Sequence, residues 1–316
     1  MTIQEIYDLA IKEAIKADFR SEKQIKERQE RLKKKYEKMS KDQKEDYDKE
    51  RLSNPYSDGR ILYGNPQKKV KNILIGIDIG GEEMLLAKSL KDIDLVISHH
   101  PMGIGLSGLD DVMEMQIDLM CEYGVPENIA EKLILKRIGE VARGISSSNH
   151  NRVVDMAKIL DIPLMCLHTP CDNLAAKFVS DKIEKDKPVF VDDIMSSLRE
   201  IPEYREAVKI GAGPKIFVGS GENRVGKVVL TEMAGGTEGA PEIYERLSQA
   251  GVGTVVGMHI SEKHRIEAEK ALVNIIIAGH ISSDSIGVNL FLDKLEQKKI
   301  NITPCSGLIR VSRNKK

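Results

Sequence analysis

Histidine and aspartate side chains occur in three short segments of this sequence, and each segment follows an apolar stretch of strand length. The segments are 98–101 (SHHP), 167–172 (LHTPCD) and 278–284 (AGHISSD). Imidazole and carboxylate groups are ligands by which proteins hold ions such as zinc, iron and manganese. Three imidazoles and two carboxylates can hold two divalent ions that share a bridging carboxylate or water. The candidate metal ligands are therefore His99, His100, Asp172, His280 and Asp284.

Each segment also has an interpretation that needs no metal. Successive residues of a strand point to opposite faces, so His99 and His100 reach one cleft only if the strand has ended at the following proline. Otherwise they are polar loop residues. Asp172 could instead cap the helix that follows it. His280 and Asp284 share a helix face at a spacing of four, which suits one ion but also suits an ordinary helix start. The metal hypothesis rests on the three segments occurring together.

The three segments need strands whose carboxyl ends meet at one edge of a sheet. Residues 72–79 (NILIGIDI), 94–98 (DLVIS) and 162–167 are apolar, β-branched runs of strand length. Helical patterns follow at 82–90 and at 173–185. Strand–helix–strand units build parallel sheets that are buried on both faces. Open sheets of this kind bind ligands outside the carboxyl ends of their strands, where the three segments lie.

A second α/β block begins near residue 206. It has predicted strands at 227–231, 253–256 and 273–278, and predicted helices after Pro241, at 262–272 and from about residue 284. Both halves repeat the order strand, loop and helix, which hints at a duplication, although no residue-level repeat supports one. We predict an α/β fold of two related halves, with central, largely parallel sheets flanked by helices.

Two further segments lie outside this pattern. Residues 20–52 hold 13 basic and 9 acidic side chains and few apolar ones, which favours a solvated helix or mobile arm over a coiled coil. Residues 110–150 are mostly helical, and we expect an inserted helical lid or rim. The predicted domains are the N-terminal helix and charged arm at 1–53, a first half with the insertion at 54–200, and a second half that completes the metal site at 201–316.

The composition excludes several classes of protein. The 316 residues are 41% hydrophobic and 31% charged, which suits a buried core and not a membrane protein. Forty-eight basic residues face 49 acidic ones and aromatic residues are only 4%, so nucleic-acid binding is not expected. Four cysteines without a CxxC pair argue against a disulfide scaffold and a zinc finger. Without a signal-peptide pattern or a spanning apolar run, we expect a cytoplasmic protein without a membrane partner.

The motifs resemble those of the Nif-three-like family (NGG-one-interacting factor three), also described as GTP cyclohydrolase I type 2 homologues. The matching stretches are DLVISHHP (94–101), LHTPCD (167–172) and AGHISSD (278–284), with weaker matches at 57–66, 73–79 and 228–239. The resemblance implies the Nif-three-like fold. It also implies two metal ions, held by the paired histidines before proline, the aspartate of the second stretch and the late histidine–acid pair. In this sequence these positions are His99, His100, Asp172, His280 and Asp284.

The sequence departs from the family pattern at two places. The family usually has glutamate at the position of Asp284, so the shorter side chain here could bind one ion only, or act through water. Pro170 and Cys171 replace a typical Asn-Leu pair, and Cys171 is either a soft ligand that favours iron or zinc or a bystander. We expect His168 to support a ligand rather than bind metal, and Asp78 to accept a hydrogen bond from a ligating histidine.

Three hypotheses of function follow. In the first, two divalent ions (zinc, iron or manganese) activate a water for a cyclohydrolase-like or phosphohydrolase-like reaction, and Glu232 or His259 handles protons. The family name implies a phosphorylated or nucleotide-like small molecule as its substrate. In the second, the same cluster carries iron or zinc to a partner or a cofactor-building enzyme. The third is an oligomeric scaffold or regulator that uses the arm at 20–52. The resemblance also implies a homo-oligomer, often a hexameric ring.

Overall fold

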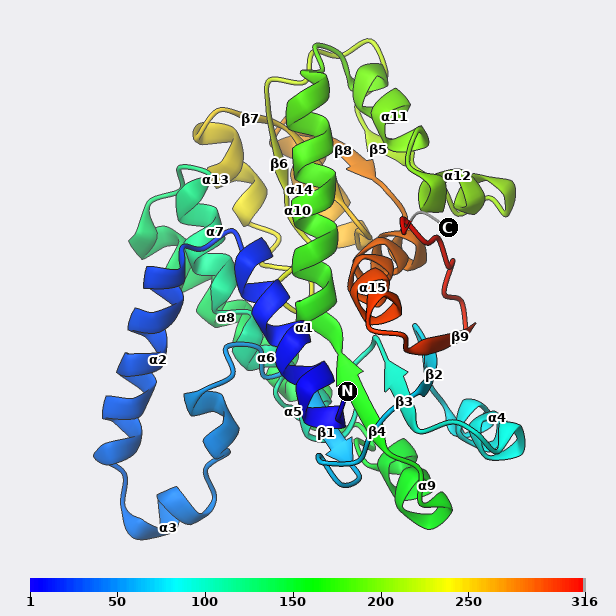
Figure 1. Ribbon diagram of the computed structural model, residues 1–316. Coiled ribbons are helices and arrows are strands. Elements are labelled where there is room, and N and C mark those ends of the chain that lie inside the picture. Colours follow the sequence, from blue (N-terminus) through cyan, green and yellow to red (C-terminus); the bar gives the residue numbers. More distant parts are fainter. Residues whose placement is uncertain (315–316) are drawn as a thin grey trace.

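The computed structural model describes residues 1–314, which form two β-sheets with helices packed against them (Figure 1). The first sheet has the strand order β1-β4-β3-β2-β9, and the second has the order β5-β8-β7-β6. The first sheet consists of β1 (Gly59–Tyr63), β2 (Asn72–Gly76), β3 (Leu95–Ser98), β4 (Leu164–Leu167) and β9 (Asn301–Cys305). The second consists of β5 (Lys215–Val218), β6 (Lys227–Leu230), β7 (Val252–Gly257) and β8 (Asn274–Ile277). The predicted α/β fold is confirmed.

Most of the strands run parallel to their neighbours. In the first sheet only β1 is antiparallel, to β4, and in the second only β5 is antiparallel, to β8. Parallel sheets are covered on both faces, which explains why their strands are continuous apolar runs. In β2, for example, Ile73, Leu74 and Ile75 are all buried. The prediction of largely parallel sheets is therefore confirmed.

Three strands, β1, β5 and β9, are not among the predicted ones. All three lie at the edges of their sheets, and β5 and β9 are only partly buried, so their sequences lack a continuous apolar run. β9 comes from the C-terminal part of the chain but pairs with β2, so the segment 201–316 contributes to both sheets. The predicted domain boundaries themselves stay predictions.

Two long helices, α10 (His168–Asp186) and α15 (His280–Gln297), lie side by side at the centre of the molecule and contribute to the cores beside both sheets (Figure 1). A Cβ atom added at Gly287 would lie 2.0 Å from the carbonyl oxygen of Cys171, so this glycine lets the two backbones approach closely.

Both central helices, α10 and α15, begin shortly after a strand, four or five residues before the predicted starts. At α15 the turn is made by Gly279 with a φ of +112°, a conformation that favours glycine.

Helices cover both faces of the first sheet. On one face, α4 (Gly81–Leu90) and α9 (Arg152–Leu160) pack their apolar residues against β2, β3 and β4. On the other face, α1 (Ile3–Ala17) packs with α10 and α15. The two layers exclude water from the sheet and leave the carboxyl ends of its strands as the place where polar side chains can gather.

The inserted helices have a structural role that the sequence does not predict. They are α5 (Gly103–Ser107), α6 (Leu109–Val112), α7 (Met115–Glu122) and α8 (Glu127–Ile145). Leu119, Met120 and Ala130 of α7 and α8 share a core with the second sheet, with α13 (Ile243–Gln249) and with α14 (Glu262–Lys270). The segment expected to form a lid or rim therefore covers a sheet. On the other side of the second sheet, α11 (Val191–Arg199) and α12 (Pro202–Lys209) complete the core.

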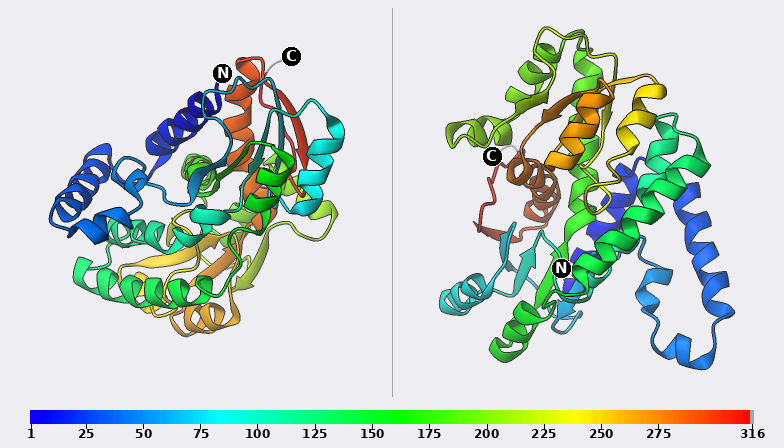
Figure 2. Two further views of the ribbon diagram at one scale, coloured as in Figure 1. Left: turned by 90° about the horizontal axis from the view of Figure 1, so that it is seen from below. Right: turned by 180° about the vertical axis from the view of Figure 1, so that it is seen from behind.

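The charged segment forms an arm of α2 (Glu22–Glu37), α3 (Lys41–Glu45) and a 3₁₀ turn, η1 (Lys49–Leu52), which projects from one side of the molecule (Figure 2). The outward positions of α2 are charged and Ile25 is its one buried residue, as predicted for a solvated helix. The arm returns to the body at Arg60, whose buried guanidinium pairs with Asp48 and Glu50. None of the helices in residues 1–314 is long and apolar enough to span a membrane.

Candidate metal centre

The predicted metal ligands come together at the carboxyl ends of strands from both sheets. His99 and His100 follow β3, while Asp172 lies in the second turn of α10, directly after β4. His280 opens α15 after β8, and Asp284 lies one turn further along the same helix. The two central helices and one loop thus bring together side chains that are up to 185 residues apart in the sequence.

The ligand atoms fall into two groups that share Asp284. Nε2 of His99 lies 3.3 Å from Oδ1 of Asp172 and 3.5 Å from Oδ1 of Asp284. Nε2 of His100 and Nε2 of His280 lie 3.4 and 3.6 Å from Oδ2 of Asp284. Two atoms that bind one zinc ion at about 2.1 Å in tetrahedral geometry lie about 3.4 Å apart. Both groups therefore have the spacing of a metal site.

Asp284 faces the two groups with different oxygens. Its Oδ1 is directed at the first group and its Oδ2 at the second, and the residue is only 1% exposed. From the sequence, the shorter side chain of Asp284 could limit it to one ion or to contact through water, and this stays a prediction. Both of its oxygens lie within 3.6 Å of imidazole nitrogens, a spacing that also suits a bridging carboxylate.

The outward nitrogens of the paired histidines are engaged by oxygen atoms behind them. Nδ1 of His99 lies 3.2 Å from the carbonyl oxygen of Leu167, and Nδ1 of His100 lies 2.6 Å from Asp78. An acceptor at Nδ1 selects the tautomer whose Nε2 lone pair is free for a metal. Asp78 therefore lies where the sequence predicts it, in contact with a candidate ligand.

Several buried atoms at the centre lack hydrogen-bond partners. They are Nε2 of His99, Oδ1 of Asp172 and Oδ2 of Asp284. Buried polar atoms are nearly always paired, so such a cluster needs an explanation. Burial opposes a charge on His99, but Asp284 and Asp172 outweigh it and raise the pKa of His99. Burial would raise the pKa of Asp284, but the charge of His99 holds it well below its usual range. The centre therefore favours a bound cation, and its donor set fits a divalent metal ion.

A second cluster of titratable residues lies beside the centre. The ring of His259 is 5.1 Å from that of His280, and its Nδ1 lies 3.4 Å from Oε1 of Glu238. Glu232 is half-buried with one carboxyl oxygen shielded from water, and burial raises its pKa to about 7 although the charge of His259 opposes this. Glu232 also has a φ of +59°, a strained conformation for a residue with a side chain. Of the two predicted proton-handling residues, His259 lies beside the candidate ligand His280, and Glu232 lies near enough to His259 to be affected by its charge.

Glu238 holds this second cluster together. It accepts a hydrogen bond from the backbone N–H of Ser261 at 2.6 Å, and its other oxygen lies 3.4 Å from Nδ1 of His264. Burial opposes its charge, but the hydrogen bond of His259 and the charges of both histidines lower the pKa of Glu238 to about 2. Glu238 is thus a permanent carboxylate behind His259.

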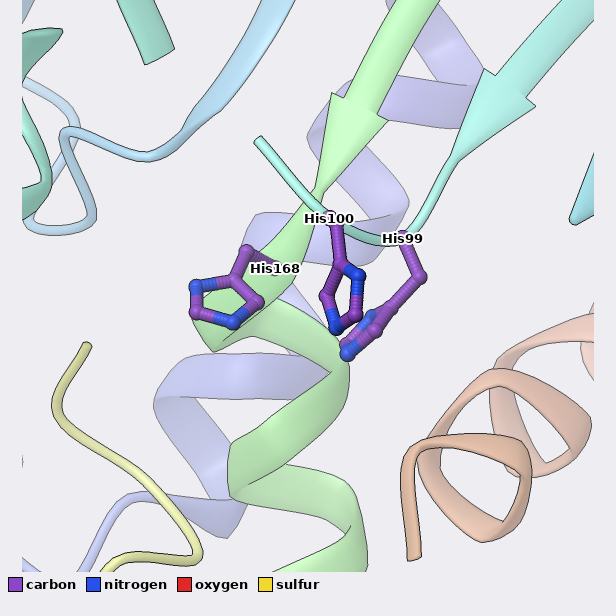
Figure 3. A group of neighbouring side chains, drawn as sticks. All are labelled: His99, His100 and His168. Atoms are coloured by element: carbon purple, nitrogen blue, oxygen red, sulfur yellow. The ribbon is translucent and has the colours of Figure 1, made fainter. Parts of the chain in front are cut away.

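Two residues at the centre have roles that the sequence does not predict. His168 points its ring toward His99 and His100 (Figure 3), and the three could together hold an ion. Asp58, which is completely buried, accepts hydrogen bonds from Nδ1 of His168 and from Thr169. Asp58 lies in a stretch that reads as a turn, and nothing local connects it to residue 168. Cys171 is in none of the ligand groups and packs in an apolar cluster beside the first sheet.

Comparisons with known proteins were made for the whole chain. No protein-family model matches it, and no curated protein matches it. Among solved structures, a NIF3 superfamily protein from Sphaerobacter thermophilus is 28% identical, with a TM-score of 0.71 over 80% of this chain and 92% of that chain. Reduced HcgD from Methanocaldococcus jannaschii is 13% identical, with a TM-score of 0.47 over 78% and 87%. A Bacillus cereus protein related to NIF3 is 12% identical, with a TM-score of 0.40 over 82% and 93%.

Proposed function

We propose that this chain, which matches the NIF3 superfamily in structure and has buried His/Asp groups able to bind metal, is a metal-dependent hydrolase. The observation that carries the proposal is the convergence of five ligand side chains at separations of 3.3 to 3.6 Å around buried atoms without partners. When bound, two divalent ions would supply an activated water and charge stabilisation of the reacting group. Three imidazoles and two carboxylates suit zinc, iron or manganese.

The chain's own residues would hold and move the proton. Glu232 has a pKa of about 7, so it is partly protonated near neutral pH and can give or take a proton. Glu238 is ionised and accepts a hydrogen bond from Nδ1 of His259, which leaves Nε2 of His259 free to face the centre. We assign proton transfer to Glu232 and His259 on this basis.

The open side of the centre is where a substrate would enter. The side chains of His100 and His280 are 25% and 42% exposed, whereas His99 and Asp172 are buried. A cavity of about 440 Å³ lies against His100 and is lined also by Asp78, Ser98 and Arg152. We propose a phosphorylated or nucleotide-like small molecule as the substrate, in keeping with the family resemblance.

Elemental analysis of untagged protein, purified without chelator, tests the proposal. We expect about two ions per chain in the wild type and at most one in the His99→Ala/Asp172→Ala variant, because the variant removes two ligands of one group and leaves the group of His100, His280 and Asp284 intact. A His150→Ala variant should keep both ions, since His150 belongs to none of the ligand groups. Unchanged metal-dependent hydrolysis of a phosphate ester by the double variant would rule the mechanism out.

A metal carrier is the second candidate, because the exposed imidazole of His280 would let an acceptor reach an ion directly. A carrier would transfer its ion to a chelating acceptor and show no turnover of phosphate esters.

A wild type that binds no metal even after reconstitution would favour the scaffold hypothesis, in which partner binding depends on the arm. We also propose a homo-oligomer, a hexamer by resemblance, which light scattering after size-exclusion chromatography can measure.

A further inference from the structure

Three imidazoles at the centre, those of His99, His100 and His168, are oriented in the same way. In each, Nδ1 faces an oxygen acceptor behind the ring: the Leu167 carbonyl at 3.2 Å, Asp78 at 2.6 Å and Asp58 at 2.8 Å. Figure 3 shows the three side chains close to one another, and their ligand atoms could hold one ion. Such acceptors are the usual partners of metal-bound histidine, since they fix the ring and its tautomer. The chain therefore holds His168 in the way it holds two of the five predicted ligands.

From this arrangement we propose that His168 is itself a metal ligand, bound to the same ion as Asp172 and positioned by Asp58. The proposal rests on the proposed function in one respect, since it requires that a metal ion binds at this centre. It adds a sixth protein ligand to the five that the sequence predicts.

The acceptor behind His168 is well defined. Oδ2 of Asp58 lies 2.8 Å from Nδ1 of His168 and 2.7 Å from the hydroxyl of Thr169, which can only donate to a carboxylate. Asp58 is fully buried, so this carboxylate has no water with which to exchange its partners. In the neutral ring the proton is therefore on Nδ1, and Nε2 of His168 carries the lone pair.

That lone pair faces another acceptor. Nε2 of His168 lies 3.5 Å from Oδ2 of Asp172, and the ring is buried. Two lone pairs facing one another at this distance repel unless a proton or a metal ion lies between them. The distance equals that between His99 and Oδ1 of Asp284, which belong to one of the ligand groups. A metal ion satisfies His168 and Asp172 as it satisfies the other pairs.

The two metal positions then differ in kind. In this proposal the inner position combines the group of His99, Asp172 and Asp284 with His168, which lies 3.5 Å from Asp172, and all four residues are buried. The outer position draws on His100 and His280, which are partly exposed, and on the second oxygen of Asp284. A site with four protein ligands is closed, whereas one with three leaves a place for water or substrate. The inner ion should therefore be retained and the outer ion should exchange.

Titration with Co²⁺ tests this, because visible absorption reports the ligands while elemental analysis counts the ions. In the wild type we expect two phases, of which the tighter survives mild chelation. His168→Gln, whose amide can still donate to Asp58, should weaken the tight phase by at least about 10-fold and change its spectrum. Asp58→Asn should weaken the same phase by about 10- to 100-fold, the range for loss of such a supporting contact. The weaker phase should be unchanged in both, which also shows that each variant is folded.

His150→Gln is the matched control, because it replaces a histidine that belongs to none of the ligand groups. It should leave both phases as they are. A His168→Gln protein that binds two ions with the wild-type affinities and spectrum would overturn the assignment of His168 while leaving the proposed function intact. A wild type that binds no Co²⁺ would instead contradict the proposed function itself.

Discussion

At the scale of single residues, Asp284 is the one candidate ligand that belongs to both ligand groups. Its two oxygens serve different ligand groups, so the two ions would depend on one carboxylate. Asp284→Asn replaces one oxygen with an amide nitrogen that cannot bind a cation. We expect this variant to lose affinity for at least one ion by more than about 100-fold, beyond the effect of losing a supporting contact. Calorimetric titration with Zn²⁺ measures this. His280→Gln should weaken only the outer ion, and equal losses in the two variants would contradict a bridge.

The raised pKa of Glu232 predicts how the stability of the protein depends on pH. Burial raises its pKa from 4.5 to about 7, so the folded protein holds this proton more tightly than the unfolded chain does. Its contribution to stability is complete below pH 4.5 and is lost as the pH rises to 7. Glu232→Gln removes this dependence. In metal-free protein, the free energy of unfolding of the variant relative to the wild type should therefore rise by about 3 kcal/mol between pH 4.5 and pH 8. Urea denaturation at both pH values checks this, and a constant difference would contradict it.

At the scale of secondary-structure elements, the contact between α10 and α15 sets the distance between Asp172 and Asp284. Gly287→Ala would place a methyl group 2.0 Å from the carbonyl oxygen of Cys171, so the helices must separate. We expect a loss of stability of about 1–3 kcal/mol, as for other overpacked cores, together with weaker metal binding. Thermal unfolding with and without metal gives both quantities.

Gly144→Ala provides the control for that experiment. Gly144 lies in α8, and a Cβ atom added there meets no atom within 4 Å. Because alanine favours a helix over glycine, this variant should be more stable than the wild type by about 0.5–1 kcal/mol. If both substitutions had the same effect, the close approach of the two central helices would not explain the first.

At the scale of the whole molecule, the metal centre joins elements from both sheets. Bound ions should therefore stabilise the entire fold, by about 2.7 kcal/mol when the free metal concentration is 100 times the Kd. We expect the midpoint of thermal unfolding to rise with added Zn²⁺ in the wild type and to rise less in His99→Ala/Asp172→Ala, which keeps only the ligand group of His100, His280 and Asp284. A rise of the same size in the double variant would mean that the metal binds elsewhere.

Local patterns of residue types predict the parallel strands and the five candidate ligands. An apolar β-branched run shows a buried strand whatever its partners are, and polar residues just after it mark the carboxyl end. The matching stretches of the family lie at these same strand ends. The edge strands β1, β5 and β9 were not predicted, because partly exposed strands lack a continuous apolar run.

Which residues far apart in the sequence come into contact depends on how the whole chain packs. The contact between Asp58 and His168 spans 110 residues, and β9 pairs with a strand 229 positions earlier in the sequence. The inserted helices α7 and α8 cover the second sheet, because their apolar residues complete its core. These arrangements follow from packing between segments far apart in the chain, which no local pattern of residue types encodes. The contacts that orient the ligands of a metal centre, such as that of Asp58 with His168, therefore cannot be predicted from local patterns of sequence.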